Sequence, residues 1–361
     1  MDRIARIGVD LAKNVMQLHG VDAAERVVVR KAISRDKFLE WFANRERCVI
    51  AMEACSSAHF WARRLREMGH DVRLIPSQFA APYRKGGARV KNDALDAEAI
   101  CEAASRPHMR YVPIKTAAQQ GVLVLHRVRL GLVEERTALV NRLRGLLAEF
   151  GVFLPQGINR FRDGFVESVE DGSNEIPGLT RTALLRGWAR FSEIEGEVKW
   201  YDAQIAQHAK EDHNARRVVE MFGVGLLTAS AATATVGDAR QFRNGRQFAA
   251  WLGLVPKQNS SGGKDRLGRV TKQGNEYLRT LLFQCARVTV TAARRRKDKL
   301  SRWIAALSER VGHGKALVAV ANKHARVLWA ILAKGERFNP DYIDMRRAES
   351  DALPRSTTHQ A

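Results

Sequence analysis

The chain has 361 residues, enough for two packed domains and a connector between them. Its 60 Lys and Arg against 39 Asp and Glu give a formal net charge of +21. Such an excess indicates a polyanionic partner. A ribosomal or histone-like binding protein without catalytic activity would show the same excess, so charge alone does not indicate an enzyme. The four cysteines form no CxxC pair, which argues against a disulfide framework or a zinc site.

No secretory leader is expected, because the first residues run directly into a strand pattern. The apolar stretches near the C-terminus, such as residues 316–321, are broken by Lys323 and Arg326. None is therefore expected to reach the ~20 residues of a membrane span. The sequence predicts no membrane partner and a cytoplasmic, nucleoid-associated location.

The N-terminal part has the pattern of an α/β domain. Residues 4–21 alternate apolar and polar side chains and turn at 22–24 into a second strand over 26–33, which predicts a hairpin. A helix begun at Ser34, a buried strand over 47–52, a helix ended at Gly69 and a strand over 72–75 follow. This order predicts a mixed sheet with helices, as in ribonuclease-H-like folds.

Two of these strands end in a carboxylate. Asp10 follows apolar residues of the first strand, and Glu53 ends the strand over 47–52. An acid among apolar neighbours is costly to bury unless its charge is compensated. Carboxylates brought together at one rim of a sheet need a cation between them or a proton on one of them. For either residue taken singly, a capping or surface acid is the simpler explanation.

A further pair of acids stands at a predicted helix start. Asn92 is expected to cap the helix, which places Asp93 and Asp96 on one face of its first turns. Glu98 falls on a different face and is expected to be solvated. Four converging carboxylates would hold two Mg²⁺ or Mn²⁺ ions ~4 Å apart, positioned to polarise a phosphodiester.

Basic residues accompany these acids. The glycine-rich stretch 83–91 is suited to tracking a phosphate backbone, with a solvated loop as the alternative. The stretch from Arg287 to Arg337 carries 13 Lys and Arg against 3 Asp and Glu. The residues expected to contact nucleic acid are Arg84, Lys85, Arg89, Lys91, Lys257, Lys264, Arg294, Arg295 and Arg296.

The middle of the chain predicts long helices. Within a helix over 119–150, leucines recur every seven residues, and a second apolar stripe runs over 191–205. These two apolar stripes, here called the seam, favour a coiled-coil hairpin or a contact between subunits. The core stripe of an ordinary helical domain explains the spacing equally well. Residues 151–178 are expected to form a loop or insertion. The heptad positions are Leu125, Leu132, Leu139 and Leu146.

The C-terminal part, from Arg216, is expected to be mainly helical. It opens with a glycine turn, Gly223-Val-Gly225, that could present backbone N–H groups to a phosphate, although a plain interhelical turn is the commoner explanation. Ser260 and Ser261 lie in a polar loop beside glycines and lysines. Such basic surroundings could support a serine nucleophile, and more often the pattern is a simple flexible turn.

Together these motifs resemble those of the DEDD-type insertion-sequence transposases of the IS110 family, and within it the IS1111 branch. The resemblance covers about the first 150 residues and roughly residues 216–330. The motifs that carry it are Gly8-Val-Asp10 with Lys13, Met52-Glu53-Ala54, Val90-Lys-Asn-Asp93, Asp96-Ala-Glu98, Gly223-Val-Gly225, the run from Ala250 to Pro256, Ser260-Ser-Gly-Gly263, and Gly274-Asn275 with Leu278-Arg279.

The resemblance implies a RuvC-like nuclease domain whose metal-binding tetrad is Asp10, Glu53, Asp93 and Asp96. It also implies a C-terminal serine that attacks DNA and becomes covalently linked to it, with Ser261 the better match and Ser260 its rival. Further implications are donor and target DNA as substrates, a structured guide RNA from the element, and a dimer or tetramer that pairs one subunit's acids with another's serine. With the helix pattern, this gives a nuclease domain over 1–115, a coiled-coil connector over 116–215, a transposase domain over 216–340 and a disordered tail over 341–361.

Two other functions account for part of the pattern. A Holliday-junction resolvase or plain nuclease would use the same acidic fold without a serine nucleophile. A non-catalytic basic architectural protein would explain the charge and leave the four acids unexplained.

Overall fold

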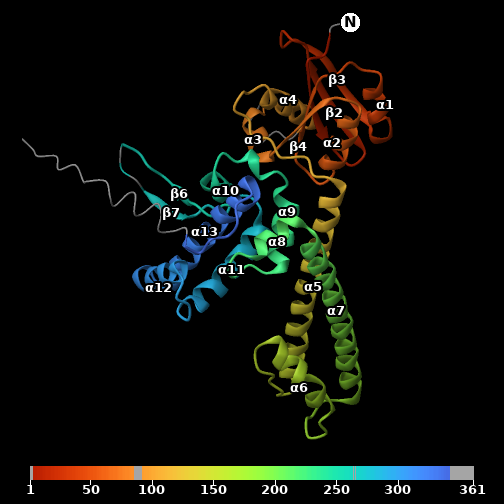
Figure 1. The fold of residues 1–361 in the computed structure, drawn as a ribbon. Helices are drawn as coiled ribbons and strands as arrows, with labels where there is room; N and C mark the ends of the chain where they lie inside the picture. The colour runs from red at the N-terminus through yellow and green to blue at the C-terminus, as the bar shows by residue number, and fades with distance from the viewer. Residues whose placement is uncertain (1–2, 85–91, 263, 265, 342–361) are drawn as a thin grey trace, which may run out of the picture. The chain divides into compact units, whose positions relative to one another are not determined.

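The structure is a computed structural model that describes residues 3–84, 92–262, 264 and 266–341 (Figure 1). The chain divides into two compact units, residues 1–120 and 121–361. The first unit is an α/β domain and the second is helical apart from one short β-hairpin. The sequence-predicted tail over 341–361 falls outside the described residues from 342 onward.

A five-stranded sheet forms the centre of the first unit, with the strand order β3-β2-β1-β4-β5. β1, β2 and β3 pair antiparallel, whereas β4 pairs parallel with both β1 and β5. This mixed order confirms the ribonuclease-H-like fold expected from the sequence. The strands are β1 (Arg6–Leu11), β2 (Val15–Val21), β3 (Val27–Ser34), β4 (Val49–Glu53) and β5 (Asp71–Ile75).

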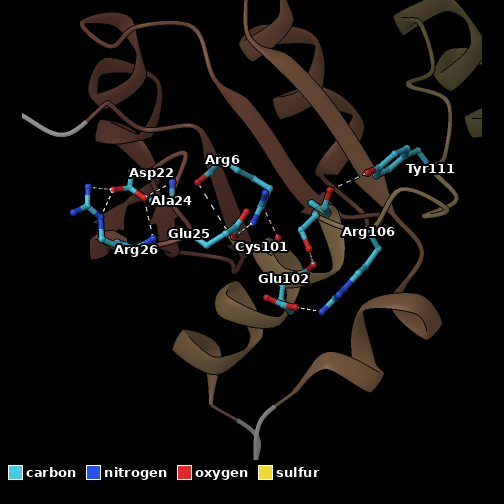
Figure 2. Close-up of polar contacts among 11 residues, drawn as sticks. Arg6, Asp22, Ala24, Glu25, Arg26, Cys101, Glu102, Arg106 and Tyr111 are labelled. Carbon is cyan, nitrogen blue, oxygen red and sulfur yellow. Dashed lines mark hydrogen bonds and ion pairs between the residues drawn. The ribbon is translucent and has the colours of Figure 1, made fainter.

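The single strand expected over residues 4–21 is wrong, because the chain turns at residues 12–14 and forms both β1 and β2. The buried positions change parity across this turn: Ile7 and Val9 are buried before it, Met16 and Leu18 after it. Side chains on a strand alternate between faces, so a change of parity marks a break. The turn expected at 22–24 is confirmed, since Asp22 Oδ1 accepts the N–H groups of residues 24 and 26, both at 2.9 Å (Figure 2).

Helices cover both faces of the sheet. On one face, α1 (Phe38–Ala43) and α2 (Ala58–Glu67) bury an apolar core with Ile7, Ile50 and Leu74. On the opposite face, α3 (Ser77–Ala80) and α4 (Asp93–Ala104) pack over Ala51 and Ile75. Gly8 and Ala51 lie on this second face, and their small size lets a helix approach the sheet closely there.

A long helical hairpin begins the second unit. α5 (Ala117–Ala148) and α7 (Gly178–Glu211) lie side by side and pack through Leu132, Ile194 and Val198 (Figure 1). Arg136 of α5 pairs with Glu195 of α7 at 2.9 Å. The predicted seam is therefore closed by a helix of the same chain. Leu146 is 46% exposed and takes no part in it.

The loop expected over residues 151–178 is wrong, because it contains α6 (Ile158–Glu170). Phe161, Phe165 and Val169 recur every four residues and are fully buried against α5 and α7. The ring of Phe165 stacks on that of Trp188 at 5.6 Å. The Gly and Asn content of the flanking residues conceals this apolar stripe, which is the helical signal.

The C-terminal part of the second unit has its own apolar core, which includes Phe248, Leu282 and Leu328. Its elements are α8 (His213–Val219), α9 (Leu226–Val236), α10 (Gly245–Trp251), β6 (Pro256–Gln258), β7 (Leu267–Val270), α11 (Glu276–Ala293), α12 (Lys299–Val311) and α13 (His313–Lys334). The glycine turn before α9 packs against α11, because a Cβ at Gly223 would lie 2.1 Å from Thr289 Oγ1. This contact favours the plain interhelical turn.

Among the described helices, α13 alone is long and apolar enough to cross a membrane by length and composition. We expected Lys323 and Arg326 to leave no apolar stretch near the C-terminus as long as a membrane span, and this expectation is therefore wrong. The buried face of α13 belongs to the apolar core of the C-terminal helices, through residues such as Val320 and Leu328. A core helix of a globular protein passes the same test of length and composition.

Candidate functional site

The contact between β1 and α4 depends on a glycine two residues before Asp10. A Cβ at Gly8 would lie 2.2 Å from Ala97 O and 2.4 Å from Cys101 N, so only glycine fits there. Residues two apart on a strand share a face, so Asp10 lies on the face that α4 covers. The missing side chain thus lets the first turn of α4 approach the end of β1.

Arg6 fixes the other end of the same helix. Its Nε donates a hydrogen bond to Cys101 O at 2.8 Å, and its guanidinium pairs with Glu25 of the β2–β3 turn (Figure 2). Beyond this point, Arg106 pairs with Glu102 at the C-terminal end of α4. The hydrogen bond of Arg6 holds α4 along β1 and so helps to position its N-terminal carboxylates, whereas the Arg106–Glu102 pair joins residues four apart at the end of the helix itself.

Three of the four predicted acids converge. One carboxylate oxygen from each of Asp10, Asp93 and Asp96 lies within 4.8 Å of the other two. Asn92 caps α4 as predicted, with its Oδ1 accepting the N–H of Ala94 at 3.0 Å. Asp93 is exposed and Asp96 is only 6% exposed, so the group extends from the surface into the domain.

Glu53 is not a member of this group of three. It is the last residue of β4. The register pairs Val9 with Met52, and continuing it by one residue places Glu53 next to Asp10 at the same end of the sheet. Its charge helps to raise the pKa of Asp10. The structure therefore brings Glu53 to the rim of the acidic group.

Asp10 is the acid whose protonation the surroundings change most. Its pKa is raised from 3.8 to about 6, first by burial and then by the charges of Asp96, Asp93 and Glu53. Arg84 acts in the opposite direction. A group of carboxylates that opposes its own ionisation in this way is stabilised by an added cation.

Arg84 contacts the acids. Its Nε lies 2.5 Å from Asp96 Oδ1, in an ion pair with a nearly buried carboxylate. Among the described residues, no donor is aligned for a hydrogen bond to that oxygen, although it is buried. A buried oxygen without a directed donor and two further carboxylates within 4.8 Å form the hard donor set that suits Mg²⁺ or Mn²⁺. The other basic residues predicted beside this site, Lys85, Arg89 and Lys91, lie outside the described residues.

The predicted serine loop is the tip of the β6–β7 hairpin, and glycines close its base. A Cβ at Gly253 would lie 2.2 Å from Gln273 O, and one at Gly274 would lie 1.8 Å from Trp251 O; both glycines have positive φ. The buried side chain of Arg279 donates from Nη1 to Gln273 O at 3.1 Å. The Gly and Arg residues of this motif thus join the two ends of the hairpin.

The two serines of this loop differ in their contacts. Ser260 Oγ accepts hydrogen bonds from Gln258 Nε2 at 3.0 Å and from Arg266 N at 3.3 Å. Ser261 is exposed, and its backbone oxygen accepts the N–H of Lys264 at 3.1 Å. Its hydroxyl makes no hydrogen bond to a described residue. Lys257 and Lys264 are both exposed beside it.

The predicted arginine cluster lies at the end of α11 and in the turn to α12. Arg294, Arg295 and Arg296 are all exposed. Arg296 is held by Asp298 Oδ2 at 2.9 Å and lies 4.1 Å from the ring centroid of Phe222. Within this cluster, Arg294 and Arg295 are thus the side chains more available to a polyanion.

Sequence reasoning missed a buried polar network in the second unit. His126 Nε2 lies 2.9 Å from Ser230 Oγ, and His126 Nδ1 lies 3.0 Å from Tyr277 Oη. His208 Nδ1 approaches the same serine hydroxyl at 3.0 Å. The network joins α5 and α7 to α9 and α11. These residues are 22 to 151 positions apart, so no local pattern could have found them.

A ribonuclease-H-like domain with converging carboxylates, followed by a helical domain with an exposed serine hairpin, defines a DEDD-domain transposase of an insertion sequence. Two family models match the chain: one for the DEDD domain of IS110 elements, described as "Transposase", over residues 7–152, and one described as "Transposase IS116/IS110/IS902 family" over residues 215–301. The chain belongs to the IS110 family of transposases.

Full-length relatives agree with these matches. A Pseudomonas aeruginosa protein named "Probable family 20 transposase" is 47% identical over 93% of this chain and 99% of its own length. The transposase for insertion sequence element IS1111A of Coxiella burnetii is 39% identical over 94% of this chain and 92% of its own. The transposase for element IS1328 of Yersinia enterocolitica is 35% identical over 94% and 100%. The family expected from the sequence motifs is therefore confirmed.

Proposed function

We propose that this transposase cuts and rejoins DNA strands with divalent metal held by Asp10, Asp93 and Asp96, and that Glu53 completes the tetrad. The observation that carries the proposal is the convergence of three carboxylate oxygens within 4.8 Å of one another. Bound Mg²⁺ or Mn²⁺ would polarise a phosphodiester and stabilise the attacking and leaving oxygens. Asp10 and Asp96 would hold the metal from within the domain, and Asp93 would hold it from the surface.

Single isosteric substitutions test the metal site. Asp10→Asn and Asp96→Asn are expected to abolish Mg²⁺-dependent strand cleavage while preserving the fold, because each removes one charged ligand and little volume. Glu102→Gln is the matched control, since Glu102 lies on the same helix outside the group of three acids, with its side chain 45% exposed and paired with Arg106. Near-normal cleavage by both aspartate variants, measured on supercoiled DNA, would remove the tetrad from the function.

We further propose that Ser261 is the nucleophile that becomes linked to DNA during strand exchange. Its hydroxyl is exposed and makes no hydrogen bond to a described residue, whereas that of Ser260 is engaged within the hairpin. A serine hydroxyl needs a base or a metal to react at neutral pH. We infer that this activation comes from a group brought to the loop when DNA is bound.

Covalent trapping separates the two serines. With a nicked DNA substrate, Ser261→Ala is expected to abolish the protein–DNA adduct and leave DNA binding unchanged, while Ser260→Ala retains the adduct. Peptide mapping of the wild-type adduct by mass spectrometry should place the linkage on Ser261. A linkage on Ser260 would contradict the assignment, and cleavage without any adduct would indicate attack by metal-activated water, as in a resolvase.

We infer that donor and target DNA are bound together with a structured guide RNA, by a dimer or tetramer of the IS1111 branch acting at the nucleoid. The net charge of +21 and the similarity to the IS1111A transposase support this. Functionally, residues 1–115, 116–215 and 216–340 would be nuclease domain, connector and transposase domain. Sequencing of RNA that co-purifies with the protein tests the guide, and light scattering tests the oligomer.

A further inference from the structure

A cavity of about 510 Å³ lies among the C-terminal helices, and none of its lining residues belongs to the serine hairpin. Its walls are the start of α10, the second half of α13 and residues 336–340. Gly245 shapes it, because a Cβ there would lie 3.0 Å from both the Cα and the carbonyl oxygen of Arg326. The close approach of α10 to α13 places side chains from both helices around one opening.

The cavity is strongly basic. Among its described lining residues, one is acidic, and this residue, Glu336, lies 3.4 Å from Lys334 in an ion pair. Five of the six cationic side chains are exposed and the sixth, Lys323, is half-buried. The cationic lining residues are Arg243, Arg246, Lys323, Arg326, Lys334 and Arg337. Cations concentrated around a concave surface raise the local concentration of anions.

Lys323 is the least exposed of these cations. Its pKa is lowered from 10.5 to about 8, mainly by burial and also by the neighbouring charge of Arg326. Its ammonium group lies 5.7 Å from the ring centroid of Trp303. An anion bound beside Lys323 would offset both the burial and the repulsion, so the position favours a negatively charged ligand.

Apart from Asn244 and Asn339, the remaining side chains of the lining are apolar. Leu300, Val327, Ile331 and Phe338 contribute to the wall, so the cavity has an apolar surface as well as a basic one. Volumes of about 300–1,000 Å³ are typical of sites that enclose a small organic molecule. A free phosphate would leave the apolar part of this cavity unfilled, whereas a nucleotide has both an anionic group and a flat apolar one.

We propose that this cavity binds one nucleotide of a single-stranded nucleic acid segment, with the phosphate among the arginines and the base against the apolar wall. The proposal rests on the proposed function only for the identity of the polymer. A base within a duplex must be unpaired and unstacked before it can enter a cavity, which costs free energy, so an unpaired strand is the favoured ligand. DNA and RNA strands share this chemistry, and the experiment distinguishes them.

Chemical footprinting of Lys323 in the full-length protein tests the proposal. The protein is treated with an amine-acylating reagent, without Mg²⁺, and the modification of Lys323 is measured by mass spectrometry. Short single-stranded DNA and single-stranded RNA are expected to protect Lys323 from acylation, and the strand that protects it more identifies the natural ligand as DNA or RNA. A duplex of the same length is not expected to protect it. Lys315, exposed at the start of α13 and outside the cavity lining, is the internal control and should react equally throughout.

Paired variants connect the footprint to the cavity. The double variant Arg246→Gln/Arg337→Gln is expected to lose the protection and to bind the single strand about tenfold more weakly, as for two lost charge-assisted contacts. Arg302→Gln/Arg310→Gln removes the same charge from exposed positions on α12 outside the cavity and should keep the protection. Equal reactivity of Lys323 with and without the single strand, equal protection by the duplex, or equal loss in both double variants would overturn the proposal. The Asp10→Asn protein should give the wild-type footprint, so failure of the metal-site function remains distinguishable.

Discussion

Near the candidate metal centre, the absence of a side chain at Gly8 determines where helix α4 can lie. Gly8 has no Cβ, and α4 takes the space where one would be. The packing of α4 on Gly8, in which no acidic residue takes part, therefore brings Asp93 and Asp96 close to Asp10. The same device closes the serine hairpin, where Gly253 and Gly274 allow backbone segments to meet.

A methyl group at Gly8 is expected to disturb this contact. Gly8→Ala should lower the free energy of unfolding by about 1–3 kcal/mol through overpacking and should weaken Mg²⁺-dependent cleavage, because α4 must move away from β1. Urea denaturation and a cleavage assay measure the two effects. Gly145→Ala, in α5 with nothing within 4 Å of the added Cβ, is the control and should be neutral or slightly stabilising. Unchanged stability and activity in Gly8→Ala would show that the contact does not position α4.

A second prediction at this scale concerns His324, which is fully surrounded by protein. Neither ring nitrogen has a hydrogen-bond partner in the part of the chain that the structure describes, and burial lowers its pKa from 6.5 to about 4. Between pH 6.5 and 4 the unfolded chain binds the proton and the folded one does not, so stability falls as the pH falls through this window. A shift of this size corresponds to about 3 kcal/mol.

His324→Leu should therefore reduce the loss of stability on acidification from pH 6.5 to 4, as measured by urea denaturation at each pH. Part of the loss should remain, because the pKa of His126 is also lowered to about 4. The exposed His313 offers the control substitution, His313→Gln, which should leave the pH profile unchanged. An identical profile for wild type and His324→Leu would contradict the assignment.

At the scale of helices and strands, the sequence predicted what depends on local pattern. Alternating strands and the Asn92 cap predicted the elements that carry Asp10, Asp93 and Asp96. Strand ends that share one edge explain why Glu53 lies near Asp10, whereas Asp93 and Asp96 reach Asp10 because α4 packs closely on Gly8. The pattern around α6 is ambiguous, because the flanking glycines and asparagines are typical of a loop, whereas the spacing of Phe161 and Phe165 is typical of a helix. The ion pair of Arg84 with Asp96 could not be predicted, because it depends on how the chain returns to the sheet.

The network of His126, Ser230 and His208 joins the helical hairpin to the C-terminal helices. Ser230→Ala is expected to lower the free energy of unfolding by about 1–3 kcal/mol, because it leaves buried histidine nitrogens without a partner. Hydrogen exchange should show faster opening of α5 near His126. Ser192→Ala, at an exposed position of α7, is the control. Unaltered exchange around His126 would show that the serine does not hold the helices together.

At the scale of the whole molecule, the charge predicts how binding responds to salt. Nucleic-acid affinity should fall steeply with ionic strength, because bound phosphates release their counterions. Arg294→Gln/Arg295→Gln should reduce the slope of log affinity against log salt by roughly one per lost phosphate contact. Arg296→Gln, whose side chain is held by Asp298, should change it less. If nucleic-acid affinity hardly differs between low and physiological salt, the net positive charge of the chain does not serve to bind phosphates.

The ion pair between Arg84 and Asp96 also turns metal loading into an exchange reaction. A cation that takes Asp96 Oδ1 must displace the guanidinium, so the apparent affinity of the acids for metal is reduced by the free energy of that pair. Under the proposed function, a DNA phosphate that draws Arg84 away would remove the competitor. By thermodynamic reciprocity, metal would then strengthen DNA binding by the same factor, and substrate and cofactor would be coupled through one displaced side chain.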